Sequence, residues 1–190
     1  PSASQRLQDG DIVNLDITLE QQGFIADSSK MYLIGQVSAA AQQLSAVCYQ
    51  ALWLGIGAVR PGARLGDIGF AIQEHTEKKH GYGVVRELVG HGLGKALHED
   101  PQVPNYGKRG TGMKLVENLV LAIEPMITRG SARTKVLADD WTVVSADKSR
   151  GSHFEHTYAV MPDGKPFVLT SFDGGKSELS RLGVEVSELL

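Results

Sequence analysis

Five side chains in this 190-residue sequence could together perform metal chemistry. Four are carboxylates on strand-like segments, Asp16, Asp27, Glu124 and Glu155, and the fifth is the imidazole of His91 between the two glycines of VGHGLG. Four carboxylates balance the charge of two divalent cations, and two ions about 3.5–4 Å apart can polarise a carbonyl and deliver hydroxide to it. An oxygen-rich set with one imidazole suits Mn, Fe, Co or Zn rather than a thiolate-type structural zinc site.

Three of these residues also have simpler interpretations. Glu124, at the end of NLVLAIEPM, could cap a turn; Glu155, in HFEHTYAV, could be an exposed strand residue; and His91 could be held in a loop by hydrogen bonds. The metal hypothesis therefore depends on the set rather than on any one member. His98 is a candidate for a different role, because an imidazole beside the metals could hydrogen-bond a scissile carbonyl and stabilise the developing oxyanion.

The two aspartates lie on segments whose alternation of apolar and polar residues predicts two strands, 13–20 and 24–33. If the turn between them has an even loop with Glu20 opposite Gly23, Asp16 faces Asp27. Like charges directly opposite repel, and a bridging cation would turn that repulsion into attraction. An odd loop, or a solvated face, would leave the aspartates as ordinary surface charges.

The remaining pattern predicts helices over 38–58 and 65–79 and strands over 84–89, 119–123, 142–146 and 153–160. Residues 100–112 are rich in Gly and Pro and have no hydrophobic periodicity, which indicates a loop. A hairpin, two helices and then further strands predict an α+β fold with helices packed over a largely antiparallel sheet.

Composition excludes several classes of function. A hydrophobic content of 42% and a charged content of 22% are typical of a soluble globular domain. A net charge of −3 argues against nucleic acid or an anionic membrane as the main partner, and no apolar run has the length of a membrane span. The single cysteine, Cys48, excludes an internal disulfide and fits a reducing cytoplasm. The sequence has no P-loop, no HExxH and no G-x-S-x-G motif.

Six stretches carry a resemblance to a known family: DGDIVNLDIT, GFIADSSKM, VVRELVGHGLGKALHEDPQVPNY, LAIEPMI, DDWTVVSAD and FEHT. In this order they resemble the type I methionine aminopeptidases, metal-dependent enzymes of the pita-bread fold. The similarity runs from about Asp9 to Pro166. It implies an antiparallel sheet with helices packed on its outer face.

The resemblance also implies roles for individual residues. Asp27 and Glu155 would bridge two divalent ions (Co, Mn, Fe or Zn), Asp16 would bind one of them, and His91 and Glu124 the other. Glu124 would also carry a proton, and His98 would contact the substrate's peptide bond. Trp141 and Leu97 match positions that line the methionine pocket, although the sequence pattern alone would place Trp141 in partly buried packing.

The implied activity is removal of the N-terminal methionine from nascent proteins, by hydroxide attack at a dinuclear metal centre, in the cytoplasm. The resemblance suggests a monomer with the ribosome as a candidate partner. Two alternatives remain open: an Xaa-Pro aminopeptidase or dipeptidase of the same fold, and an inactive pita-bread module that binds peptides or proteins. Members of the family normally have a further N-terminal segment with a second active-site histidine and several pocket residues, whereas this sequence begins at Pro1. We therefore expect residues 1–190 to form a single metallopeptidase domain that is truncated at its N-terminus.

Overall fold

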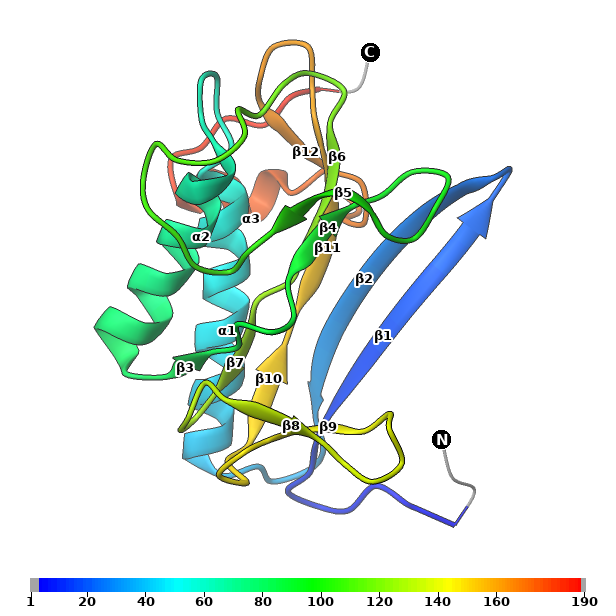
Figure 1. The fold of residues 1–190 in the computed structure, drawn as a ribbon, viewed down its shortest axis with the longest axis vertical. Helices are drawn as coiled ribbons and strands as arrows, with labels where there is room; N and C mark the ends of the chain where they lie inside the picture. The colour runs from blue at the N-terminus through cyan, green and yellow to red at the C-terminus, as the bar shows by residue number, and fades with distance from the viewer. Residues whose placement is uncertain (1–3, 189–190) are drawn as a thin grey trace.

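The computed structural model describes residues 4–188, so the truncation expected at Pro1 lies outside the described residues. The main sheet has the strand order β1-β2-β11-β6-β4-β5, with β12 paired to β11, and every neighbouring pair is antiparallel (Figure 1). Its strands are β1 (Ile12–Gln21), β2 (Phe24–Leu33), β4 (Gly90–Gly92), β5 (Glu99–Val103), β6 (Val120–Ile123), β11 (Glu155–Val160) and β12 (Pro166–Val168).

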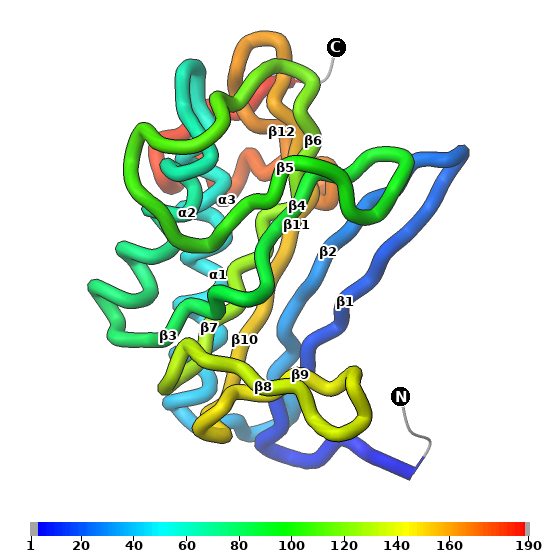
Figure 2. The backbone as a smooth tube through the Cα atoms, viewed as in Figure 1, coloured from blue at the N-terminus to red at the C-terminus, as the bar shows by residue number. Residues whose placement is uncertain are grey.

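Two smaller antiparallel sheets complete the strand structure. One joins β10 (Gly151–His153), β7 (Met126–Thr128) and β3 (Gly83–Val84), and the other is the ribbon of β8 (Thr134–Val136) and β9 (Val143–Ser145). The trace in Figure 2 shows this ribbon near the lower ends of β1, β2 and β10. The predicted largely antiparallel α+β fold is confirmed.

The helices lie together on one side of the main sheet, opposite the β1–β2 hairpin (Figures 1 and 2). They are α1 (Ala39–Gly57), α2 (Leu65–Gln73), which continues as a π-helical turn (Glu74–Lys79), and α3 (Lys176–Arg181). Helix α1 begins after Ser38, whose hydroxyl accepts a hydrogen bond from the Ala41 N–H at 3.4 Å. Its buried stripe recurs every four residues, at Leu44, Cys48, Leu52 and Ile56, so one face of α1 packs into the core against the sheets.

The hairpin forms as predicted, but its register differs from the one expected. Gln21 pairs with Phe24, so Asp16 lies opposite Ser29 and Asp27 lies opposite Thr18. The loop therefore has two residues, Gln22 and Gly23, both with positive φ, as a tight hairpin turn requires. The expectation that Asp16 faces Asp27 is wrong, because the pairing is displaced by two residues. An even displacement keeps both carboxylates on the same face of the sheet.

Two further segments differ from expectation. Of the region expected as a strand over 84–89, only Val84 is in a strand, as the second residue of β3. β5 forms at the start of the region expected to be a loop. The pairing of β5 with β4 depends on backbone hydrogen bonds and on the absence of side chains at Gly90 and Gly92, which hydrophobic alternation cannot reveal. Within residues 4–188, no helix combines the length and apolar character needed to cross a membrane.

Candidate metal centre

A row of residues across three strands brings two of the predicted ligands together. Asp16 on β1 lies opposite Ser29 on β2, and Ser29 lies opposite Glu155 on β11. Paired residues in neighbouring strands project from the same face of a sheet. Asp16 and Glu155 therefore lie on either side of the small side chain of Ser29, which leaves room between them.

A second row positions Asp27 and His91. The Thr157 hydroxyl donates to the Asp27 carbonyl at 2.7 Å and accepts from the Asp27 N–H at 3.0 Å, which fixes β2 against β11. Thr157 pairs with Ala122, and Ala122 pairs with His91 across β6 and β4. A Cβ added at Gly90 or Gly92 would lie 2.4 or 2.2 Å from a carbonyl oxygen of the neighbouring strands, so only glycine permits this close packing around His91.

The His91 ring is oriented by its own turn of backbone. Its Nδ1 lies 2.9 Å from the Gly92 carbonyl oxygen, so Nδ1 carries the proton and donates it, which leaves the lone pair of Nε2 free. That Nε2 lies 3.3 Å from Oε1 of Glu124, which follows the end of β6. A histidine with its Nδ1–H bonded to a carbonyl and its Nε2 directed at carboxylates is arranged as a metal ligand.

The donor atoms form two adjacent groups that share one residue. Asp27, His91 and Glu155 each offer an atom within 4.8 Å of the others, and so do Asp16, His153 and Glu155. Glu124 contacts both groups, since its second oxygen Oε2 lies 3.7 Å from Nε2 of His153. The structure thus brings all five predicted ligand residues together, and it adds a histidine that the sequence interpretation missed.

Burial makes the ionised carboxylates of this cluster unfavourable when no cation is bound. Glu155 is only 2% exposed, and burial together with Glu124, Asp27 and Asp16 raises its pKa to about 9. Burial, with Asp16 and Asp27, likewise raises the pKa of Glu124 to about 8. Burial and Asp27 raise the pKa of Asp16, against a smaller lowering by His91. Divalent cations would reverse these shifts, because they favour the ionised carboxylates.

The hydrogen-bonding state of Glu155 provides an independent test of whether these residues fit metal ions. Its Oε1 is buried and has no hydrogen-bond partner among residues 4–188. A buried carboxylate oxygen without a partner costs free energy unless a cation or a proton occupies that direction. The unpartnered atom and the oxygen-and-imidazole donor set therefore fit divalent ions.

Strand alternation could have indicated His153, because a residue two positions from Glu155 in a strand projects from the same face. His153 is the last residue of β10, and Phe154 separates it from Glu155 at the start of β11. Asn14 on β1 fixes its position by donating to the His153 carbonyl at 2.9 Å and to the Ser29 hydroxyl at 2.7 Å. Burial lowers the pKa of His153 to about 4, so the imidazole is neutral at neutral pH.

The three predicted substrate residues have different surroundings. The His98 ring packs edge-on against the His91 ring, with centroids 4.5 Å apart, and His98 is exposed. Leu97, beside it, is half-buried. Trp141 lies between β8 and β9 and is 86% exposed, so the expectation of partly buried packing is wrong. Two backbone N–H groups, of Trp141 and Thr142, bond the Asp139 carboxylate and hold this turn together.

A largely apolar cleft of about 680 Å³ opens beside His153. Asn14 and Met31 line it from the hairpin, and Leu137 and Val143 line it from the β8–β9 ribbon. Its apolar lining also includes Ile12, Val85, Leu88, Met126 and Ile127. This arrangement places an apolar binding volume beside His153, at the border of the carboxylate cluster.

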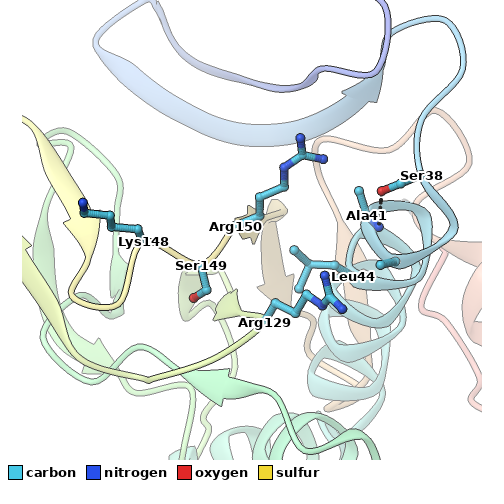
Figure 3. Close-up of a pocket in the computed structure, with 8 residues that line it drawn as sticks. Ser38, Ala41, Leu44, Arg129, Lys148, Ser149 and Arg150 are labelled. Carbon is cyan, nitrogen blue, oxygen red and sulfur yellow. Dashed lines mark hydrogen bonds between the residues drawn. The ribbon is translucent and has the colours of Figure 1, made fainter.

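A second cleft, of about 510 Å³, lies at the start of α1 and is lined by Ser38, Leu44, Arg129, Lys148 and Arg150. Figure 3 shows that the Lys148 side chain points away from the other two cationic side chains. The cations therefore do not converge on one point, and none of the predicted site residues lines this cleft.

Comparisons with known proteins agree with this geometry. Metallopeptidase family M24 matches residues 1–162. Methionine aminopeptidase B of Synechocystis sp. is 45% identical over 164 residues, covering 86% of this chain and 60% of the relative. Methionine aminopeptidase of Rickettsia prowazekii is 47% identical over 159 residues, covering 83% of this chain and 61% of the relative. The crystal structure of the methionine aminopeptidase from Rickettsia prowazekii superposes with a TM-score of 0.83 at 45% identity, covering 87% and 66% of the two chains. The chain thus spans about three fifths of the length of these two curated relatives.

Proposed function

The chain belongs to metallopeptidase family M24, and on that premise we propose that it removes the N-terminal methionine from peptides by metal-dependent hydrolysis. The observation that carries the proposal is the pair of adjacent donor groups, Asp27–His91–Glu155 and Asp16–His153–Glu155, which share Glu155. Two groups with one shared carboxylate are suited to two neighbouring ions. The curated relatives named methionine aminopeptidase supply the substrate class.

In this proposal Asp27 and Glu155 would be shared by two divalent ions, Asp16 would hold one of them, and His91 and Glu124 would hold the other. The ions, when bound, supply Lewis acidity and an activated water nucleophile. Co, Mn, Fe and Zn all suit a donor set of carboxylates and imidazole.

The chain's own residues position the substrate and move protons. Glu124 lies with Oε1 near His91 and Oε2 near His153, so one of its oxygens can take a proton from the nucleophile and return it to the departing amine. His98, packed on His91, would donate a hydrogen bond to the scissile carbonyl oxygen.

Specificity for methionine would come from apolar surface beside the cluster. The 680 Å³ cleft has Met31, Leu88 and Met126 in its lining, and flexible apolar side chains of this kind suit an unbranched thioether. Leu97 and Trp141 are proposed to line the pocket as well, in keeping with the family resemblance. We further propose that the substrates are nascent proteins in the cytoplasm, that the chain acts as a monomer, and that the ribosome is a partner.

The test is release of methionine from the peptide Met-Ala-Ser after chelation and re-addition of Mn, Co, Fe or Zn. Metal-restored release that disappears in Asp27→Asn would support the proposal, and the exposed Asp163→Asn is a control for the same chemical change. An N-acetylated Met-Ala-Ser should resist cleavage, because the reaction requires a free amine.

Three other outcomes would contradict the proposal. Cleavage of Ala-Pro peptides in preference to Met-Ala-Ser would indicate an Xaa-Pro aminopeptidase or dipeptidase. Binding of the peptide with two metals present but without release would indicate an inactive binding module. Release that is insensitive to chelation would refute the metal mechanism itself.

A further inference from the structure

We infer that His153 is itself a metal ligand, which gives the Asp16 side of the centre an imidazole of its own. The inference rests on the proposed metal centre and adds one residue to it. It would make the two halves of the site alike, with one histidine in each donor group: His91 beside Asp27, and His153 beside Asp16.

The position of the His153 ring is the first observation. Its Nδ1 lies 3.8 Å from Oδ2 of Asp16, and its Nε2 lies 3.7 Å from Oε2 of Glu124. Both distances exceed a hydrogen bond, so the ring lies among the carboxylates without being bonded to them. The Nε2–Oε2 separation is the kind expected when an ion occupies the space between two ligand atoms, and the Nδ1–Oδ2 distance places the same ring beside Asp16.

The second observation is an unpartnered nitrogen. Nε2 of His153 is buried and has no hydrogen-bond partner among the described residues, as is also true of Oε1 of Glu155. Two buried atoms of one cluster, each able to bind a metal and each without a hydrogen-bond partner, require a common explanation. A cation that contacts both atoms satisfies them together.

The third observation is that the ring's other nitrogen can be satisfied by the protein. Nδ1 lies 3.3 Å from the hydroxyl oxygen of Ser29, which has two lone pairs and can accept from both Asn14 and His153. In that tautomer the lone pair of Nε2 is free for a metal. His91 has the same arrangement, with the Gly92 carbonyl in place of Ser29.

An imidazole on the Asp16 side has a consequence for metal preference. Carboxylate sets suit Mn, whereas imidazole favours Zn and Fe. Loss of the His153 ring should therefore weaken binding of Zn more than binding of Mn. This selectivity separates direct ligation from a role in packing, because a packing defect would weaken binding of both metals alike.

The test is a long-range ¹H–¹⁵N correlation spectrum of the zinc-loaded protein, with zinc affinities from calorimetry. We expect Nε2 of two histidines, His91 and His153, to move to the chemical shift of metal-bound nitrogen. His153→Gln should lose one of these signals, bind one of its two zinc ions at least ~10-fold more weakly, and bind Mn with a smaller loss. Ser29→Ala should keep both signals and weaken the same zinc ion by a smaller factor.

The control is His80→Gln, which removes a histidine that packs on His75 and Tyr82, away from the carboxylates. It should change neither the metal-bound signals nor the affinities. An unshifted His153 signal in the wild-type zinc protein would overturn the inference, and this readout requires no folded variant. If the wild type bound no zinc at all, the proposed function would fail as well, so the two failures are distinguishable.

Discussion

Replacing Glu155 by Gln should remove a large part of the alkaline destabilisation of the metal-free protein. Glu155 is buried, and its pKa is raised from 4.5 to about 9 by burial and by its carboxylate neighbours. The folded state therefore retains a proton that the unfolded chain releases. The stability that this proton provides is fully present below pH 4.5 and is lost as the pH rises through about 9.

The loss of stability due to Glu155 is best measured above pH 6.5. Below that pH, the buried histidines change the stability in the opposite direction. Burial lowers the pKa of His75, His153 and His156 to about 4, so stability is gained as the pH rises from 4 to 6.5 and the unfolded histidines lose their protons. Between pH 6.5 and 9 each pH unit costs about 1.4 kcal/mol per retained proton, so Glu155 alone contributes a loss of about 3 kcal/mol. For a domain of this size that loss is a fall in Tm of roughly 6–12 °C.

The assay is thermal unfolding followed by circular dichroism at pH 6.5 and pH 9, after removal of metal. Wild type should lose stability over this interval, and Glu155→Gln should lose about 3 kcal/mol less, since the amide is permanently neutral. The exposed Glu117→Gln is the matched control and should behave as wild type. Saturating zinc should flatten the wild-type profile, because the ions stabilise the ionised carboxylates. An equal fall in wild type and Glu155→Gln would refute this account of the buried carboxylates.

Three further substitutions test how the fold positions the site. Thr157→Val should destabilise the protein by about 2 kcal/mol in urea unfolding, because it leaves the buried N–H and C=O of Asp27 without their hydroxyl partner. The control Thr111→Val, which changes an exposed side chain, should have little effect. Gly92→Ala should cost roughly 1–3 kcal/mol, since its Cβ would meet the Asp100 carbonyl oxygen at 2.2 Å, and an unchanged midpoint would show that β4 can move away from β5. Gln22→Gly should stabilise the hairpin by about 0.5–1 kcal/mol, because Gln22 has a φ of 54°, and a lower Tm in this variant would contradict the turn geometry.

The sequence predicted most of the elements that carry the site. The alternation in β1 and β2 predicted the hairpin, and the apolar stripe of α1 predicted that helix almost to the residue. The five carboxylate and imidazole residues of the predicted centre come together in the structure. The elements were predictable because each depended on local periodicity, and the grouping of the five side chains follows from the strands that carry them.

The errors share a physical cause, which is that pairing between strands is a tertiary property. The register of the hairpin depended on whether Gln22 would adopt a left-handed conformation, and nothing in the strands themselves decides this. His153 was missed because only the tertiary arrangement shows that it lies near Asp16 and Glu124. β10 and β11 belong to different sheets, yet across their junction at Phe154 His153 and Glu155 still reach the same cluster, as alternation within one strand would also predict.

The position of β1 at the end of the main sheet has a consequence for the order in which ions bind. Asp16 lies on this edge strand, with its side chain 51% exposed, whereas Asp27 and His91 lie on interior strands. Edge strands open more readily than central ones. The group of Asp27, His91 and Glu155 is therefore in place before any ion arrives. The group that contains Asp16 is complete only while β1 stays paired with β2. The second ion should therefore bind more weakly than the first, and its arrival should slow amide hydrogen exchange along β1 while leaving exchange in β6 and β11 unchanged.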